Sequence, residues 1–168
     1  MPKIIENPEG LLIEEAKKQI AQNGYAAVTI RSIAKGCGVG VGTVYNYFPS
    51  KEALIATCLL EDWKRCTAAI QEAADSAGSA EPVLLCIYQQ LVAFARRHQS
   101  VFRDETAASG FAGSFSRYHT LLRSQLARPL RRFCGSEFAA LFAAESLLTW
   151  SMAGKSFDEI HEILRKLF

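Results

Sequence analysis

The segment from Val41 to Phe48 carries side chains whose chemistry suits contact with the edges of DNA base pairs. If this segment is helical, Val44 and Phe48 pack against the rest of the chain. The open face of the helix then holds these four side chains: Val41, Thr43, Asn46 and Tyr47. An Asn amide pairs with adenine, and an aliphatic side chain packs on the thymine methyl group. The segment therefore predicts contact with an AT-containing DNA site, made without any charge on the helix.

Two short helices joined by a glycine turn would position that face. The first short helix follows Thr29, whose hydroxyl is a suitable N-cap, and a longer helix over Gly10–Asn23 precedes both. Gly38 lies in the turn, where the backbone needs a positive φ that glycine adopts at no steric cost. Three helices in this order form the arrangement that presents a recognition helix to the major groove of DNA.

Charge is sparse in this region and balanced over the whole chain. No Asp, Glu, Lys or Arg occurs from Gly36 to Ser50, and 19 basic against 17 acidic residues give a net charge of +2. This balance neither indicates nor excludes a nucleic-acid partner. Gly40, before the second short helix, is also a weaker cap than Ser or Thr. Affinity for DNA must then depend on cations outside this segment and on backbone N–H donors.

The same region resembles the tetracycline-repressor-like (TetR) family of bacterial transcriptional regulators. The residues that carry the resemblance are Gly24-Tyr25, Thr29-Ile30-Arg31, Ile33-Ala34, Gly38-Val39 and the unbroken string from Gly42 to Leu54. Beyond Leu54 the chain matches the layout of the family only. The resemblance implies a homodimer whose subunits each have an N-terminal DNA-binding head and a C-terminal body that binds a small effector. It further implies a repressor that binds a palindromic operator and is released by the effector.

The resemblance also implies roles for individual residues. The expected DNA contacts are Arg31, Val41, Gly42, Thr43, Tyr45, Asn46, Tyr47 and Lys51. Tyr45 and Tyr47 would contact phosphates or nearby bases, and Arg31 would reach a phosphate or a guanine. Lys51 would bind a phosphate together with the N–H groups at the start of its helix.

The rest of the chain predicts helices only. Strand-like alternation is absent, and the composition is rich in residues that favour helices. We expect an all-α fold of about nine helices, with a helix-turn-helix head on a helical-bundle body. The predicted domains are a DNA-binding domain over residues 1–50 and an effector-binding and dimerisation domain over residues 51–168. A long helix over Lys51–Ala74, with Ser50 as its expected N-cap, would be the only covalent connection between head and body.

The last two helices, expected over Glu137–Ala153 and Ser156–Phe168, carry more apolar residues than one subunit can cover. Paired across a two-fold axis, they would form a four-helix dimer interface. The residues predicted for this interface are Leu141, Leu148, Ile160, Leu164 and Leu167.

An effector pocket should be lined by aromatic residues with a few polar groups. The candidates are Trp63, Tyr88, Phe94, Phe102, Phe115 and Tyr118. Each could equally belong to an ordinary core, and the alternative function is a body that binds a partner protein. Five arginines between Arg117 and Arg132, with no acidic residue among them, predict either a solvated face or an anion site.

Other classes of function find little support in the sequence. The three histidines are scattered, and the motifs of serine hydrolases, phosphate-binding loops and zinc proteases are absent. We therefore expect no enzyme activity, no cofactor and no metal site. The five cysteines lack C-x-x-C spacing, and Cys37 within the turn could be a buried spacer or a redox-sensitive thiol. With no membrane-spanning stretch and no signal-peptide pattern, we expect a soluble, cytoplasmic protein.

Overall fold

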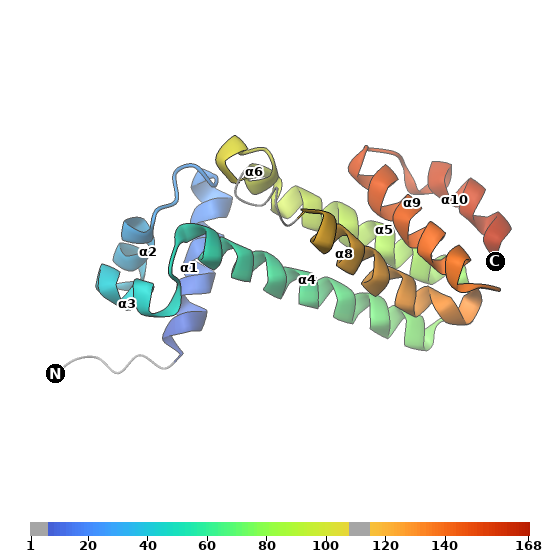
Figure 1. The fold of residues 1–168 in the computed structure, drawn as a ribbon, viewed down its shortest axis with the longest axis horizontal. Helices are drawn as coiled ribbons and strands as arrows, with labels where there is room; N and C mark the ends of the chain where they lie inside the picture. The colour runs from blue at the N-terminus through green and yellow to red at the C-terminus, as the bar shows by residue number, and fades with distance from the viewer. Residues whose placement is uncertain (1–6, 108–114) are drawn as a thin grey trace. The chain divides into compact units, whose positions relative to one another are not determined.

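A computed structural model describes residues 7–107 and 115–168 of the protein. Every secondary-structure element in these residues is helical, which confirms the predicted all-α fold class (Figure 1). Within the same residues, no helix combines the length and the apolar character needed to cross a lipid bilayer. The chain forms two compact units and passes between them at Asp62–Trp63, inside one helix, and again at Arg96–Arg97.

The first unit begins with a three-helix group that positions the predicted DNA contacts. Its elements are α1 (Pro8–Asn23), α2 (Ile30–Cys37), α3 (Val41–Tyr47), the first part of α4 (Lys51–Ser76) and α6 (Gln99–Phe102). The Asn7 side chain caps α1 by accepting a hydrogen bond from the Gly10 N–H at 3.1 Å. Leu12, Ala16 and Ile20 form the buried stripe of α1, at the i, i+4 spacing of one helix face.

The turn between α2 and α3 depends on one glycine. Gly38 has φ 67° and ψ 32°, the left-handed conformation expected from the sequence. The Val39 N–H then donates to the Ala34 carbonyl at 3.0 Å, which satisfies a carbonyl at the end of α2. Because Gly40 precedes α3 and has no side chain, α3 starts without a side-chain cap.

Two predicted N-caps are confirmed. Thr29 Oγ1 accepts from the Ser32 N–H at 3.0 Å, and the Ser32 hydroxyl accepts from the Thr29 N–H at 3.0 Å, so the two residues form a capping box. At the start of α4, Ser50 Oγ accepts from the Ala53 N–H at 3.1 Å. These caps set the points at which the chain enters α2 and α4.

The compact units differ from the predicted division at Ser50. The first unit extends along α4 to Asp62 and also includes the segment from Arg97, with α6 and the buried residues Val101 and Ala107. Between these two compact units, α4 is not the sole covalent connection. The helix α5 (Ala80–Arg97) provides a second connection, because it begins in the second unit and its last residue lies in the first.

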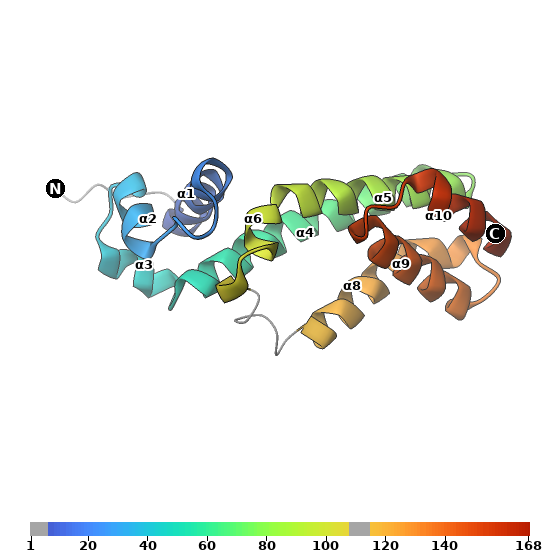
Figure 2. The ribbon, with the colours of Figure 1, turned by 90° about the horizontal axis from the view of Figure 1, so that it is seen from above.

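The second unit is a bundle of helices around a large aliphatic core. Besides the rest of α4 and α5, its elements are α8 (Phe115–Leu130), η1 (Arg131–Phe133), α9 (Glu137–Met152), α10 (Phe157–Leu164) and η2 (Arg165–Leu167). α8 runs beside α9, and α10 packs against α9 (Figures 1 and 2). Three alanines of α9, Ala140, Ala143 and Ala144, are fully buried in this core.

Three of the residues predicted for the dimer interface are buried within their own unit. Leu148, Ile160 and Leu164 lie in its core, with exposed fractions of 8%, 5% and 1%. Their contact with a second subunit stays a prediction. Leu141 is half-buried against this core, and the Leu167 side chain lies outside the described residues.

Gly38 and Gly42 provide a matched pair of glycine substitutions. A Cβ would meet nothing within 4 Å at either position, so only backbone conformation distinguishes them. We expect Gly38→Ala to lower the free energy of unfolding by about 1–2 kcal/mol, because alanine is strained at positive φ. Gly42→Ala, in a helix, should raise it by up to about 1 kcal/mol. Urea denaturation measures both values, and equal stability of the two variants would contradict the assigned turn.

Leu164 tests whether α10 is part of the subunit core. Truncating a buried leucine leaves a cavity, so Leu164→Ala should lower the free energy of unfolding by about 2–5 kcal/mol. The control Glu162→Ala, on the exposed side of the same helix, should change it by less than about 0.5 kcal/mol. Calorimetry over a range of protein concentrations measures the loss, and a Leu164→Ala variant as stable as the control would show that α10 is not packed in the core.

Candidate nucleic-acid interface

Helix α3 is anchored from one side and open on the other. Val44 is fully buried and Phe48, just after the helix, is 4% exposed. The exposed residues of α3 are Val41, Gly42, Tyr45, Asn46 and Tyr47, while Thr43 is half-buried. The structure therefore gathers the predicted base-contacting residues on one short helix with a polar, uncharged surface. Their contact with DNA stays a prediction.

Helix α2 is held against α1 by one glutamine, a contact that the sequence analysis missed. Gln19 Nε2 donates to the Ser32 carbonyl at 3.0 Å, and Gln19 Oε1 accepts from the Ser32 hydroxyl at 2.6 Å. Glu15 Oε1 accepts a further bond from Gln19 Nε2 at 2.8 Å. Ser32 thus joins the capping box to α1, and Arg31 is exposed beside it in the first turn of α2. No local pattern signals a bond between residues 13 positions apart.

Lys51 makes contacts within the protein that the sequence did not predict. Its Nζ donates to the Tyr25 carbonyl at 2.7 Å and lies 3.7 Å from the centroid of the Tyr25 ring. Burial lowers the pKa of Lys51, against the opposing charges of Asp104 and Glu52. Lys51 therefore fastens the start of α4 to the α1–α2 connection. An ammonium group has three donors, so a phosphate contact remains open to it.

The structure describes the side chains of five of the six effector candidates, and their place in a pocket stays a prediction. Trp63 and Phe94 meet edge to face, with ring centroids 5.6 Å apart, and Trp63 Nε1 donates to Gln125 Oε1 at 2.5 Å. Tyr88 packs instead near Phe157 and donates its hydroxyl to the Lys155 carbonyl at 3.0 Å. Phe102 belongs to the first unit, Tyr118 is exposed, and the Phe115 side chain lies outside the described residues.

Most of the arginines between Arg117 and Arg132 have partners within the protein. Arg123 pairs with Glu145 at 3.7 Å and Arg131 with Glu137 at 2.7 Å. Arg132 donates to the Ala77 carbonyl after the end of α4. Arg128 lines an open groove with Arg132, and the Arg117 side chain lies outside the described residues. These contacts favour a structural role over a shared anion site.

The thiol in the turn is partly shielded. Cys37 Sγ lies 3.5 Å from the Leu11 carbonyl oxygen, and burial raises the pKa of the Cys37 thiol. Cys58, deeper in the first unit, has its pKa raised to about 12, mainly by burial. Because the thiolate is the reactive form, these shifts favour the buried-spacer interpretation of Cys37.

Comparison with known proteins points to the same segment of the chain. A model of the family described as "Bacterial regulatory proteins, tetR family" matches residues 12–58, from α1 into α4. The helix-turn-helix transcriptional regulator YuxN of Bacillus subtilis, itself uncharacterised, is 46% identical over 55 residues. That alignment covers 33% of this chain and 19% of YuxN, so the chain matches about a fifth of that relative's length.

Similarity of fold extends over almost the whole chain. The crystal structure of SCO7518 from Streptomyces coelicolor A3(2) superposes with a TM-score of 0.74 at 15% identity, covering 96% of this chain and 98% of that one. A transcriptional regulator of the TetR/AcrR family from Thermobifida fusca has a TM-score of 0.61 at 15% identity, with coverages of 96% and 97%. At such identities the likeness concerns the fold. The sequence match to the tetR family of bacterial regulatory proteins is confined to residues 12–58, where it agrees with the resemblance found in the sequence.

Proposed function

We propose that this protein is a DNA-binding transcriptional regulator that places α3 in the major groove. The observation that carries the proposal is the exposed, uncharged face of α3, held by the buried Val44 and Phe48 inside a helix-turn-helix. This segment lies within the part of the chain that matches the tetR family model. A helix of this kind presents its side chains to base edges, while the preceding helix lies across the backbone.

The side chains on α3 suit direct contact with A·T base pairs. The Asn46 amide can accept from and donate to adenine, and Val41 can pack on a thymine methyl group. The two exposed tyrosines, Tyr45 and Tyr47, offer hydroxyl groups to phosphates. Arg31, at the first turn of α2, supplies a cation to a phosphate or a guanine.

We propose further that the protein acts as a homodimer on a palindromic operator. Two heads would then enter major grooves about 34–36 Å apart on one face of the DNA. Support comes from exposed apolar side chains on the last helices: Phe138 is 75% exposed, Phe142 44% and Ile163 63%. Apolar side chains exposed to this extent on neighbouring helices mark a surface for a partner. These residues replace the buried leucines and isoleucine predicted from the sequence.

The regulatory step of the proposal is release of DNA by a small effector bound in the second unit. Trp63, Phe94 and Gln125 combine aromatic surface with a polar group, as small-molecule sites do. The effector must bind the released state more tightly, and a coupling of about 1–3 kcal/mol would change operator affinity five- to 150-fold. Repression is the mode we propose. A body that binds a partner protein is the alternative, which analysis of co-purified small molecules and proteins would distinguish.

Selection of binding sites from a random duplex library tests the DNA-binding proposal and defines the operator. With the selected duplex, Asn46→Ala should cost about 1–3 kcal/mol at one base pair of each half-site and relax the preference there. The control Gln22→Ala, exposed near the end of α1, should leave the preference unchanged. Competition titrations at fixed salt measure both. If Asn46→Ala kept the full specificity ratio, α3 would not read bases through Asn46.

Sedimentation at micromolar concentration tests the dimer surface. Ile163→Glu places a charge in the proposed interface and should weaken dimerisation by at least about 2 kcal/mol, roughly thirtyfold. The control Leu60→Glu makes the same change at another exposed apolar residue, on α4 in the first unit, and should leave the dimer intact. A monomeric wild-type protein, or equal effects of the two variants, would contradict the interface.

A further inference from the structure

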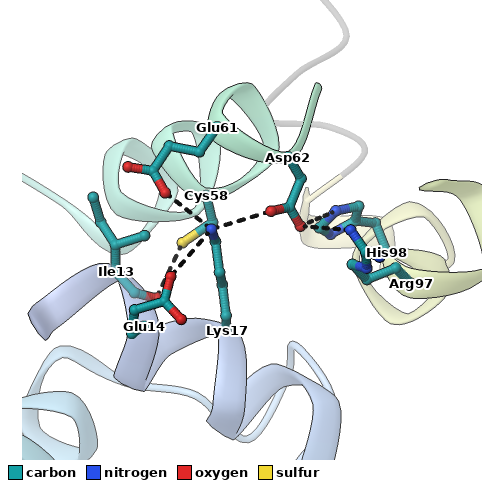
Figure 3. A network of polar contacts seen from close by, with 8 residues as sticks. All are labelled: Ile13, Glu14, Lys17, Cys58, Glu61, Asp62, Arg97 and His98. Atoms are coloured by element: carbon teal, nitrogen blue, oxygen red, sulfur yellow. Dashed lines mark hydrogen bonds and ion pairs between the residues drawn. The ribbon is translucent and has the colours of Figure 1, made fainter. Parts of the chain in front are cut away.

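The most strongly buried charge in the described part of the first unit belongs to Asp62 of α4, which is 2% exposed. Its carboxylate contacts cationic and imidazole groups from two other parts of the unit (Figure 3). Oδ1 lies 3.1 Å from Lys17 Nζ of α1, and Oδ2 lies 3.0 Å from His98 Nε2. Arg97 Nη1 approaches the same Oδ2 at 3.6 Å. We call Lys17, Asp62, Arg97 and His98 the Asp62 cluster.

The Asp62 cluster keeps its carboxylate charged despite burial. Burial alone would raise the pKa of Asp62, but the bond to Lys17 and the charges of Lys17, His98 and Arg97 hold the pKa below its usual value. Lys17 has two further carboxylate partners, since Glu61 Oε2 lies 2.9 Å and Glu14 Oε1 3.5 Å from its Nζ. A buried charge of this kind is costly to leave without its partners, so the cluster resists any movement that separates its members.

His98 lies at the start of residues 97–107, the segment in which the chain comes back into the first unit. His98 is the N-cap of α6, and its carbonyl accepts from the Val101 N–H at 2.9 Å. His98, Val101 and Ala107 are all buried in this unit, at 4%, 1% and 1% exposed. The cluster therefore joins residues 97–107, α4 and α1 at one carboxylate.

The same segment supports the connection between α1 and α2. A Cβ at Gly24 would lie 3.9 Å from Ser100 Cβ, so the α6 backbone passes close to this connection. Burial, with the charges of Glu52 and Asp104, raises the pKa of Tyr25, and the charges of Asp104 and Glu52 oppose the burial that lowers the pKa of Lys51. Tyr25, in turn, holds Lys51 at the start of α4. The connection between α1 and α2, which leads into α2 and Arg31, therefore lies close to Ser100 of α6 at its first residue, Gly24.

We propose that Asp62 is a positioning residue for DNA binding, which fastens residues 97–107 to α1 and so fixes α2 and α3. This inference rests on the proposed DNA-binding function and adds a route of regulation to it. Residues 97–107 begin at the last residue of α5. A conformational change in the second unit therefore reaches the α1–α2 connection through α5 as well as through α4. A signal that withdraws His98 from Asp62 loosens the head.

Asp62→Asn and Glu61→Gln form a matched pair that tests the proposal. Both remove a carboxylate charge next to Lys17, but only Asp62 contacts His98 and Arg97. With a selected operator duplex, we expect Asp62→Asn to lower affinity at least tenfold and Glu61→Gln to change it less than threefold. Amide hydrogen exchange should rise at least tenfold in residues 99–107 and 24–29 of Asp62→Asn, and remain unchanged in α9.

A double variant separates positioning from stability. Lys17→Met with Asp62→Leu removes both charges and leaves apolar side chains, so that neither charge of the ion pair is stranded. We expect this variant to melt close to the wild type and still lose operator affinity at least tenfold. It also serves if Asp62→Asn alone fails to fold.

The outcomes are distinct. Unchanged exchange in residues 99–107 of a folded Asp62 variant would overturn the proposal, as would raised exchange with wild-type operator affinity. Equal losses of affinity in Glu61→Gln and Asp62→Asn would assign the effect to Lys17 alone and overturn it too. If the wild type selects no sequence from the library, the DNA-binding function itself fails, and the exchange data still report whether Asp62 holds α6.

Discussion

A carboxylate removed from water stays ionised only where cations and hydrogen-bond donors surround it, and this constraint organises the first unit. The Asp62 carboxylate is surrounded by Lys17 from α1, by Arg97 at the end of α5 and by His98 at the start of α6. Segments separated by 45 and 35 residues must therefore converge on one side chain. The helix-turn-helix is built on this frame, since α1 carries α2 through Gln19.

The Asp62 cluster makes the folding stability of the first unit depend on pH. Burial lowers the pKa of His98 below 6.5, so the unfolded chain takes up a proton that the folded chain resists. The pKa of Asp62 is also lowered in the folded state, and its contribution is lost as the pH falls toward that value. Both groups therefore favour folding above their unfolded pKa values, and both contributions decline on acidification.

The helices and their ends could be predicted because their signals are local. Thr29, Ser50 and Gly38 act within four residues of their own positions, and the structure confirms each one. Contacts between residues far apart in the sequence have no such local signal. Nothing in the sequence near Lys51 indicates that it binds the Tyr25 carbonyl. The exposed face of α3 could be predicted because the apolar Val44 and Phe48 fix its orientation.

Which residues of the last helices face their own core could not be predicted, for a different physical reason. Helix α9 is apolar on most sides, so periodicity shows that it is buried but not which face meets its own subunit. Once α10 packs against α9, Ile160 and Leu164 are enclosed, and Ile163 remains outside. Choosing between two apolar faces requires the position of the neighbouring helix, which a single sequence does not encode locally.

The Asp62 cluster also constrains how this protein can change over generations. A substitution of Asp62 alone leaves the Lys17 ammonium group with fewer anionic partners. A substitution of Lys17 alone leaves the Asp62 carboxylate, which is 2% exposed, without that cation. Either first step carries a stability cost that the second step would remove, so positions 17 and 62 are expected to drift together or not at all. Glu61, with a side chain 37% exposed, is under no such restriction and is free to vary beside them.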